Sequence, residues 1–314
     1  MQESITRIFS SEPCVVVDVG ARGGFDLMKK LHGWMRVFAI EPEHNAVNDL
    51  KSSGHRFHER NVYGIALGQE EGKRQLYITK HASMSSLLEP DFGEFRRGFG
   101  GMKNSGNWMD GMKVEQTVEV NCTTLQSFAE KEVRSYIDFL KLDTQGTELE
   151  ILKSGAELLK SGKIGVVCTE VALAGLYKNQ CSFSEVDLFL RECGYHLVEL
   201  KTYPEIAERE NSVHVGRRLY ERPRSAPVGD AWYVCDRDRN SAGNSTSRTR
   251  AAFILAAEGY YSEATFLLDG LMSAEEMNSV FRFLGDDSFG KRMKHFAKQW
   301  TPPAIQQFWS KLKK

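Results

Sequence analysis

The chain has 314 residues, and its 41 Lys and Arg against 42 Asp and Glu leave a formal net charge of −1. Apolar residues make up 41% and charged residues 26% of the chain, which is ordinary for a globular protein and excludes collagen-like, low-complexity and wholly disordered chains. The near-neutral charge argues against nucleic acid as the default partner, although a chain with this net charge can still carry a local basic patch.

No apolar run approaches the roughly 20 residues that a membrane-spanning helix needs. The amino terminus, MQESITRIFSSEP, lacks the basic, apolar and small-residue regions of a secretory signal, so we expect a cytoplasmic protein. The six cysteines include no C-x-x-C pair, which favours reduced thiols over a disulfide frame or a zinc site. His55 and His58 form an H-x-x-H pair without a second ligand pair near it, and this spacing alone is weak evidence for a metal.

Short apolar runs rich in β-branched residues recur up to residue 235 and predict strands. They lie at 14–19, 37–40, 62–67, 137–142, 164–171, 196–200 and 231–235. Runs such as VVVDV lack the alternation of a half-buried strand and indicate burial on both faces of a parallel sheet. Segments with helical spacing lie at 25–31, 45–52, 124–132, 147–160 and 184–193. The alternation predicts an α/β fold that is doubly wound around a mostly parallel seven-stranded sheet.

Residues 84–112 interrupt this alternation, with six glycines among aromatic and methionine side chains. Glycine gives backbone freedom and methionine gives adaptable apolar contact, which is typical of a substrate lid, although a long surface loop explains the composition equally well.

A polar stretch, DRDRNSAGNSTSRTR, follows the last predicted strand. It predicts a catalytic domain at 1–238, a linker at 239–250 and a helical C-terminal extension at 251–314. Residues 291–314 carry seven Lys or Arg, no acid and several aromatic residues. Such a helix can lie on an anionic membrane surface or an acidic partner, but it more often packs on its own domain or on a second subunit of a homo-oligomer.

The strongest local signal is VVVDVGARGG at 15–24, a buried strand that enters a glycine-rich turn. Ligands of open α/β sheets bind at the carboxyl ends of strands beside the point where the strand order reverses. The glycine spacing does not match G-x-G-x-x-G, because Arg22 and Phe25 stand at two of the glycine positions, and a P-loop lysine is absent. A dinucleotide or a triphosphate is therefore disfavoured.

Two acids near this turn point to a cofactor. Asp18, inside the hydrophobic strand, must find donors either in its own turn or in a cationic cofactor. Glu41 ends the next strand in FAIEP, about twenty residues after the glycine turn, where an acid can accept both hydroxyls of a ribose. We therefore expect a cofactor that contains a ribose.

Over residues 13–235 the sequence resembles the FkbM family of S-adenosylmethionine-dependent methyltransferases. The resemblance rests on VVVDVGARGG, FAIEP, NVYGIALGQEEGKRQLYI, ASMSSL, YIDFLKLDTQGTELEILKSGAELL, VCTEVALAGLY and VGDAWYV. It implies the Rossmann-like fold of class I methyltransferases and S-adenosylmethionine as cofactor. It also implies a cofactor site in which one loop surrounds the methionine part, an acid and its neighbour hold the ribose, and a small residue contacts the adenine. The residues in these places are Asp18, Gly20, Ala21, Arg22 and Gly24 for the loop, Glu41 and Pro42 for the ribose, and Ala66 for the adenine.

Asp143 and Glu170 end the fourth and fifth predicted strands and should face the same crevice as Gly20 and Glu41. Methyl transfer from a sulfonium is an in-line displacement, helped mainly by holding donor and acceptor together, and a base need only remove the hydroxyl proton. We predict Asp143 first and Glu170 second as the catalytic base or the residue that positions the acceptor. A Mg²⁺ or Ca²⁺ ion between them is a weaker alternative, since no third carboxylate is plainly placed beside them.

Four polar residues are candidate contacts of the acceptor: Ser85, Ser86, Gln145 and Tyr177. Ser85 and Ser86 could equally cap a turn, and Tyr177 could equally be a packing residue.

The sequence thus predicts a methyltransferase that O-methylates a hydroxyl of a sugar, glycan or polyketide-like small molecule. The alternative from another class is a cofactor-binding assembly or interaction protein that acts through its basic amphipathic C-terminal helices. A nucleotide-sugar or NAD enzyme on a similar sheet is a third possibility, which the glycine spacing does not support.

Overall fold

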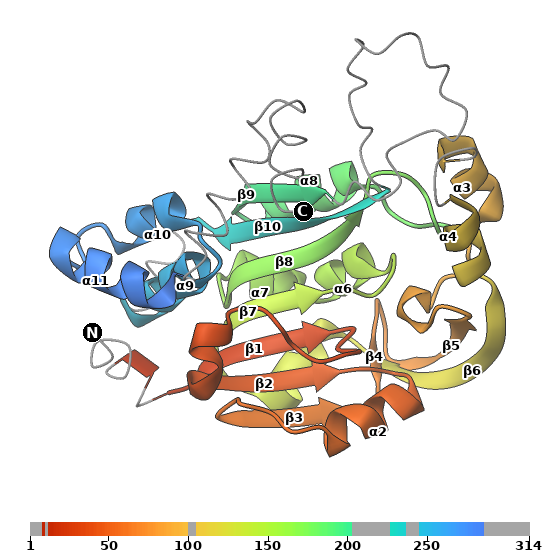
Figure 1. Ribbon diagram of the computed structural model, residues 1–314, viewed down its shortest axis with the longest axis horizontal. Coiled ribbons are helices and arrows are strands. Elements are labelled where there is room, and N and C mark those ends of the chain that lie inside the picture. Colours follow the sequence, from red (N-terminus) through yellow and green to blue (C-terminus); the bar gives the residue numbers. More distant parts are fainter. Residues whose placement is uncertain (1–7, 10–11, 100–104, 203–226, 237–244, 286–314) are drawn as a thin grey trace, which may run out of the picture.

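The computed structural model describes residues 8–9, 12–99, 105–202, 227–236 and 245–285 (Figure 1). Its central sheet has seven strands in the order β3–β2–β1–β7–β8–β10–β9. The bounds are β1 Cys14–Val19, β2 Met35–Ile40, β3 Glu59–Tyr63, β7 Ile137–Leu142, β8 Ile164–Ala172, β9 Tyr195–Thr202 and β10 Val228–Cys235. All neighbours pair in parallel except β10, which is antiparallel to both β8 and β9. The predicted doubly wound, mostly parallel seven-stranded sheet is confirmed, and its strand order reverses between β1 and β7.

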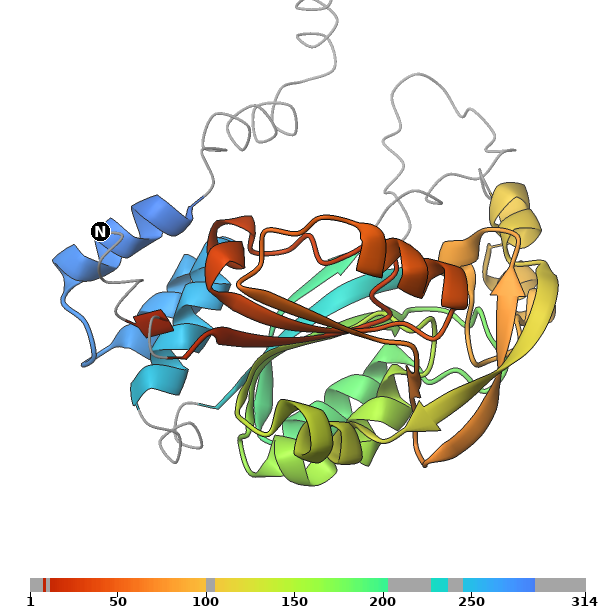
Figure 2. The ribbon, with the colours of Figure 1, turned by 90° about the horizontal axis from the view of Figure 1, so that it is seen from below.

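Helices cover both faces of this sheet, which explains why the strands are apolar without alternation (Figure 2). Successive residues of β1 point to opposite faces, so Val16 and Val17 lie in different apolar clusters. One face is covered by α5 Leu125–Phe128, η3 Ala129–Val133, α6 Glu148–Ser154, α7 Ala156–Lys160 and α8 Phe183–Glu192. The other face is covered by η1 Lys29–Trp34, α2 His44–Ser52 and α9 Ser245–Ala257.

The helix predicted at 25–31 is wrong in its bounds and its type. The chain instead forms an irregular loop and then a 3-10 helix at Lys29–Trp34. Gly24 with φ +85° and Met28 with φ +49° hold the backbone in the left-handed region, which interrupts any right-handed helix at these points. Helix α9 packs beside η1 against β7 and β8.

Helix α9 explains the role of the first part of the C-terminal region. Residues 249–256 are all buried, as expected for a helix that is surrounded by protein. It packs on the sheet, on α10 Tyr261–Leu268 and on α11 Ala274–Leu284. The linker predicted at 239–250 is wrong for residues 245–250, which are helical, because the polar Arg250 finds a buried partner in Asp138. Residues 239–244 and 291–314 lie outside the described residues, and the division into domain and extension stays a prediction.

A second, smaller sheet lies at the carboxyl ends of the parallel strands (Figure 1). It contains β4 Ala66–Leu67, β5 Gly72–Thr79 and β6 Val114–Thr123 in the order β4–β6–β5. The predicted strand 62–67 is therefore divided between the two sheets, at Tyr63 and Ala66.

The predicted insertion at 84–112 contains α3 Phe92–Phe99 and α4 Ser105–Gly111, after the short 3-10 helix η2 Ala82–Met84. The buried Phe95 and Met112 pack with Tyr177 in one apolar cluster. The role of the insertion as a lid stays a prediction. No helix in the described part of the chain is long and apolar enough to cross a membrane.

Candidate active site

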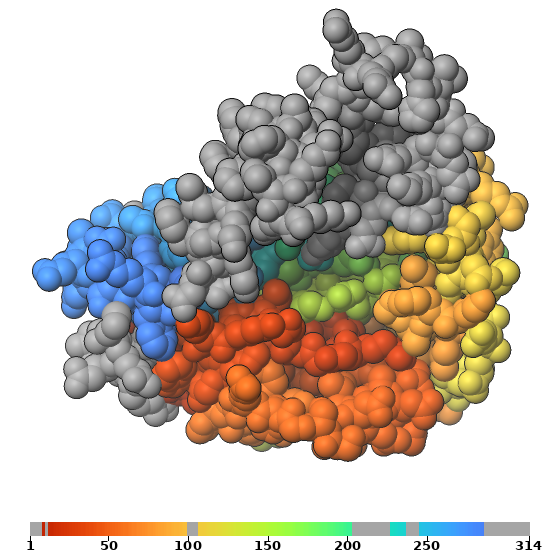
Figure 3. All heavy atoms as spheres, viewed as in Figure 1, coloured from red at the N-terminus to blue at the C-terminus, as the bar shows by residue number. Residues whose placement is uncertain are grey.

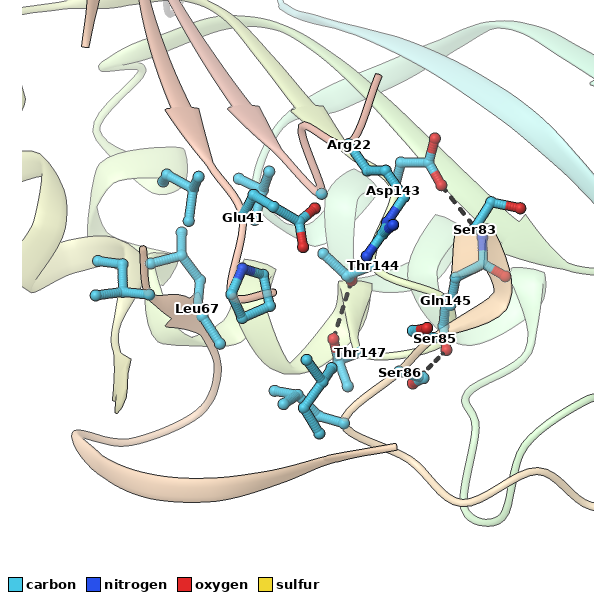
Figure 4. Close-up of a pocket in the computed structure, with 18 of the residues that line it drawn as sticks. Arg22, Glu41, Leu67, Ser83, Ser85, Ser86, Asp143, Thr144, Gln145 and Thr147 are labelled. Atoms are coloured by element: carbon cyan, nitrogen blue, oxygen red, sulfur yellow. Dashed lines mark hydrogen bonds between the residues drawn. The ribbon is translucent and has the colours of Figure 1, made fainter. Parts of the chain in front are cut away.

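A pocket lies at the carboxyl ends of β1, β2 and β7, where the strand order reverses (Figure 4). In Figure 3 the red N-terminal segments, the green central segments and the orange and yellow segments of the small sheet adjoin on one face of the molecule. Nine of the predicted site residues line the pocket: Gly20, Arg22, Glu41, Pro42, Ala66, Ser85, Ser86, Asp143 and Gln145. The position agrees with the general rule for ligand sites in open α/β sheets.

Five predicted residues do not line the pocket: Asp18, Ala21, Gly24, Glu170 and Tyr177. Asp18 and Ala21 are buried in β1 and its turn, and Gly24 donates its N–H to the carbonyl of Ala21 at 2.9 Å. Glu170 and Tyr177 contact Gln145 from behind the pocket wall. The predicted residues thus form one region of the fold, but not one surface.

Gly20 is required by the close approach of β1 and β7. Its φ is +79°, and its N–H donates to the carbonyl of Ile40 at 3.0 Å. A Cβ atom at this position would lie 1.9 Å from the backbone oxygen of Asp143, far inside van der Waals contact. The glycine therefore lets the two strand ends, with Asp143, meet at the pocket.

Asp18 is a buried carboxylate with an incomplete set of partners. Its side chain is 2% exposed, and the ammonium of Lys141 lies 3.7 Å from Oδ1. Among the described residues, Oδ1 has no hydrogen-bond partner. Burial raises the pKa of Asp18, Lys141 opposes that rise, and Asp143 adds to it. A further donor at this atom would stabilise the ionised carboxylate.

Lys141 is a site residue that the sequence analysis missed. It pairs with Asp18 across β1 and β7, and its Nζ lies 3.0 Å from Oδ2 of Asp143. Burial lowers the pKa of Lys141, but Asp18 and Asp143 more than offset this, and the net shift is upward. The only signal in the sequence was a lysine in an apolar strand, FLKLD.

Glu41 lies at the far side of the pocket and is 5% exposed. Its Oε1 accepts the backbone N–H of Glu43 at 2.9 Å. Burial raises the pKa of Glu41, while this hydrogen bond and the charge of Arg22 lower it. Glu43, which sequence reasoning also missed, caps α2 by accepting the N–H groups of Asn45 and Ala46, and its Oε2 accepts from Arg22 at 3.0 Å. Apolar side chains continue the wall beyond Glu41: Ile40, Ile65, Leu67, Leu76 and Leu87.

Gln145 connects the pocket to the carboxylates behind it. Its φ of +59° is unusual for a residue with a side chain. The amide nitrogen lies 2.8 Å from Oε2 of Glu170 and 3.2 Å from Oδ1 of Asp143, and the amide oxygen accepts from the hydroxyl of Tyr177 at 3.1 Å. The carboxylate of Asp143 is therefore held at both oxygens, by Gln145 and by Lys141.

The other predicted contacts have largely structural partners. Ser86 donates from its hydroxyl to the carbonyl of Gln145 at 2.8 Å, and Ser85 accepts the N–H of Thr79 at 3.2 Å. Tyr177 is 3% exposed, as expected of a packing residue. Burial and the charge of Asp143 raise the pKa of Glu170 well above its usual range. Glu170 does not line the pocket, whereas Asp143 does, so Asp143 is the better placed of the two carboxylates. No group of three or more possible metal ligands occurs among the described residues.

A family model described as "Methyltransferase FkbM domain" matches residues 18–197. The chain belongs to the FkbM methyltransferase family. The match begins at Asp18 and ends in β9, so it includes the whole pocket of this FkbM protein but not α9.

No curated protein matches the chain. Among solved structures, a methyltransferase FkbM from Methylobacillus flagellatus is similar with a TM-score of 0.40 and 13% identity, covering 71% of this chain and 43% of that one. This chain therefore spans less than half the length of the Methylobacillus protein. A precorrin-6y C5,15-methyltransferase from Geobacter metallireducens has a TM-score of 0.28 and 12% identity, over 74% of this chain and 87% of that one.

Proposed function

We propose that this FkbM family methyltransferase binds S-adenosylmethionine in the pocket and methylates a hydroxyl of a sugar, glycan or polyketide-like small molecule. The observation that carries the proposal is the pocket itself, in which Gly20, Glu41 and Asp143 meet at the point where the strand order reverses.

The pocket residues fit the parts of this cofactor. Oε1 of Glu41 accepts from Glu43, and because each carboxylate oxygen can accept more than one hydrogen bond, this group can also receive ribose hydroxyls. The apolar wall of Leu67, Leu76 and Ala66 suits a flat, weakly polar ring such as adenine. The bound cofactor would supply a methyl group on a sulfonium.

Asp143 is the residue best placed to handle the acceptor hydroxyl. Lys141 and Gln145 hold its two oxygens from the side of the sheet, yet each carboxylate oxygen can accept more than one hydrogen bond. The side chain is 42% exposed, so an acceptor hydroxyl can reach it. We propose that Asp143 orients this hydroxyl and takes its proton as the oxygen attacks the methyl group.

The first test is calorimetric titration of the full chain with S-adenosylmethionine and S-adenosylhomocysteine, with NAD as the control. Saturable binding of both sulfur compounds, but not of NAD, supports the cofactor assignment without knowledge of the acceptor. A labelled methyl donor then allows a screen of hydroxylated glycans and lipids. Absence of binding by a folded sample would reject the proposal.

The competing function, assembly through the basic amphipathic C-terminal helices, rests on residues 291–314, which lie outside the described residues, and it stays a prediction. Helix α9 is buried against the sheet, and the charged groups of Arg250 and Glu258 are engaged with Asp138 and with the N–H of Met28. This part of the extension contributes to the core rather than offering a free surface.

A further inference from the structure

The connection between β1 and β2 is an irregular loop that runs from the pocket to the C-terminal helix α9. Gly20 and Arg22, at the start of this connection, line the pocket. Residues 21–28 form no regular helix or strand before η1 begins at Lys29. Because such a loop lacks the hydrogen-bond ladder of a helix, its conformation depends on the partners of its backbone groups elsewhere in the fold.

The pocket end of this loop is fixed to β2. The N–H groups of Gly20 and Ala21 both donate to the carbonyl of Ile40, at 3.0 and 3.1 Å. The N–H of Gly24 then returns to the carbonyl of Ala21 at 2.9 Å. These bonds fix the first turn of the loop, but they do not reach its second half.

The far end of the loop is fixed by a residue of the C-terminal region. The backbone N–H of Met28 donates to Oε1 of Glu258 at 2.7 Å, across 230 positions of the chain. Met28 has φ +49° and ψ +43°, and its side chain is buried. A residue with a side chain keeps this left-handed conformation where the surrounding contacts determine it, and a hydrogen bond to a carboxylate is among the stronger ones that an N–H can make.

The end of α9 places Glu258 at this position. The N–H of Glu258 donates to the carbonyl of Ile254 at 3.3 Å, and Gly259, with φ +92°, ends the helix directly after it. Helix α9 contacts η1, and Figures 1 and 2 both show the light blue helix beside the red segment that contains η1. Phe25 and Met28 of the loop belong to the same apolar cluster as Ile254. The loop therefore meets α9 through a hydrogen bond and through apolar packing.

The family match ends at residue 197, so α9 and Glu258 lie outside the matched region. We propose that Glu258 is a positioning residue of the pocket, which fixes the loop at Met28 and thereby couples the C-terminal region to ligand affinity. Glu258 acts through the loop and does not line the pocket. The affinity part of this inference rests on the proposed function, because it is measured with a compound of the proposed cofactor class.

The first measurement is hydrogen exchange of the full chain without ligand, followed by mass spectrometry. Glu258→Met removes the acceptor of the Met28 N–H. The peptide that covers residues 20–34 should then exchange about 10- to 100-fold faster, as loss of a bond to a charged acceptor implies, while β8 should exchange as in the wild type. Glu258→Gln keeps an acceptor oxygen on a side chain of the same length, so it should recover most of the protection.

The second measurement is calorimetry of the full chain with S-adenosylhomocysteine. E258M should bind it about 3- to 30-fold more weakly, the range for residues that modulate a site without contacting the ligand, and E258Q should bind it more tightly than E258M does. Coupling is reciprocal, so saturating the wild type with S-adenosylhomocysteine should slow exchange of residues 245–260 as well as residues 20–34. This last comparison needs no variant.

Glu263→Met is the matched control. Glu263 lies in α10, and its Oε2 is 3.3 Å from Nε2 of His196 in β9. The variant removes the same charge from the same C-terminal region, and it should leave both the exchange of residues 20–34 and the affinity as in the wild type. Circular dichroism and melting temperature establish that each variant is folded.

The outcomes separate this inference from the proposed function. Unchanged exchange of residues 20–34 in a folded E258M would overturn the inference, as would an E258Q that exchanges as fast as E258M. Faster exchange with unchanged affinity would show that the pocket does not depend on the held loop, which also overturns it. If E258M does not fold, the wild type decides, because absence of slower exchange at residues 245–260 with bound S-adenosylhomocysteine would refute the coupling. A wild type that binds no S-adenosylhomocysteine would overturn the proposed function, and the coupling to affinity with it.

Discussion

The buried ion pair between Arg250 and Asp138 provides a direct test of how α9 is attached to the sheet. Nη1 of Arg250 lies 3.3 Å from Oδ2 of Asp138, which also accepts the N–H of Val15 at 2.7 Å. The side chains are 5% and 0% exposed. Removing one partner of such a pair leaves an uncompensated buried charge, so we expect R250M to lower the free energy of unfolding by about 3 kcal/mol at pH 7.5.

The same pair predicts the pH dependence of that loss. Burial raises the pKa of Asp138 to about 6, and Arg250 opposes the rise, so R250M should raise this pKa further. An acid whose pKa is higher in the folded than in the unfolded state gives stability that is present below the unfolded pKa and is lost as the pH rises through the folded one. At pH 5 the carboxyl is mostly protonated in both proteins. At this pH, R250M should be less stable than the wild type by only about 1 kcal/mol in the free energy of unfolding. This is the contribution of the hydrogen bond that Arg250 donates to the carbonyl of Glu12.

Urea unfolding followed by circular dichroism at pH 5 and pH 7.5 measures both values. R248M is the matched control in the same helix, because Arg248 donates to the carbonyl of Leu267 at 2.9 Å and pairs with no buried carboxylate in the described structure. R248M should lower the free energy of unfolding by about 1 kcal/mol at either pH. A loss below 1 kcal/mol for R250M at pH 7.5, or an equal loss at both pH values, would refute the reasoning.

The remaining predictions concern the pocket. Glu41→Ala should weaken the binding of S-adenosylhomocysteine, measured by calorimetry, by about 1–3 kcal/mol because ribose hydrogen bonds are lost. An unchanged affinity would show that Glu41 is not part of the site. Asp143→Asn should lower labelled methyl transfer far more than cofactor affinity, and equal activity would exclude Asp143 as the base. Gly20→Ala should lower the free energy of unfolding by about 3 kcal/mol or more, because the added Cβ would clash with the backbone oxygen of Asp143. A melting temperature like that of the wild type would contradict this geometry.

The attachment of α9 also changes how the C-terminal region can be tested. Deletion of residues 240–314 would remove eight consecutive buried residues, 249–256, and expose the sheet face that they cover. Loss of methyl transfer after that deletion would therefore report unfolding as readily as a function of the helices. Substitutions on the surface of α11, or truncation after residue 285, leave this core intact.

The sequence by itself determined the class of fold and the place of the pocket. Apolar runs without alternation require burial on both faces, and parallel strands align their carboxyl ends. For that reason Gly20, Glu41 and Asp143 could be assigned to one crevice from their positions at predicted strand ends, and all three line the pocket. Local pattern was sufficient here because strand direction alone fixes where the ends of the strands meet.

Only the tertiary structure decided which side chains line that crevice and which lie behind it. Lys141 reaches Asp18 because β1 pairs with β7 in one register, across more than a hundred intervening residues. The hydrogen bonds that join Gln145 to Tyr177 and to Glu170 likewise depend on strands and loops that are distant in sequence. Helix α9 is polar at its start and apolar around its whole circumference, so its periodicity could not show which surface covers it. Periodicity identifies an element and its apolar positions, whereas register and packing between distant segments determine the partners.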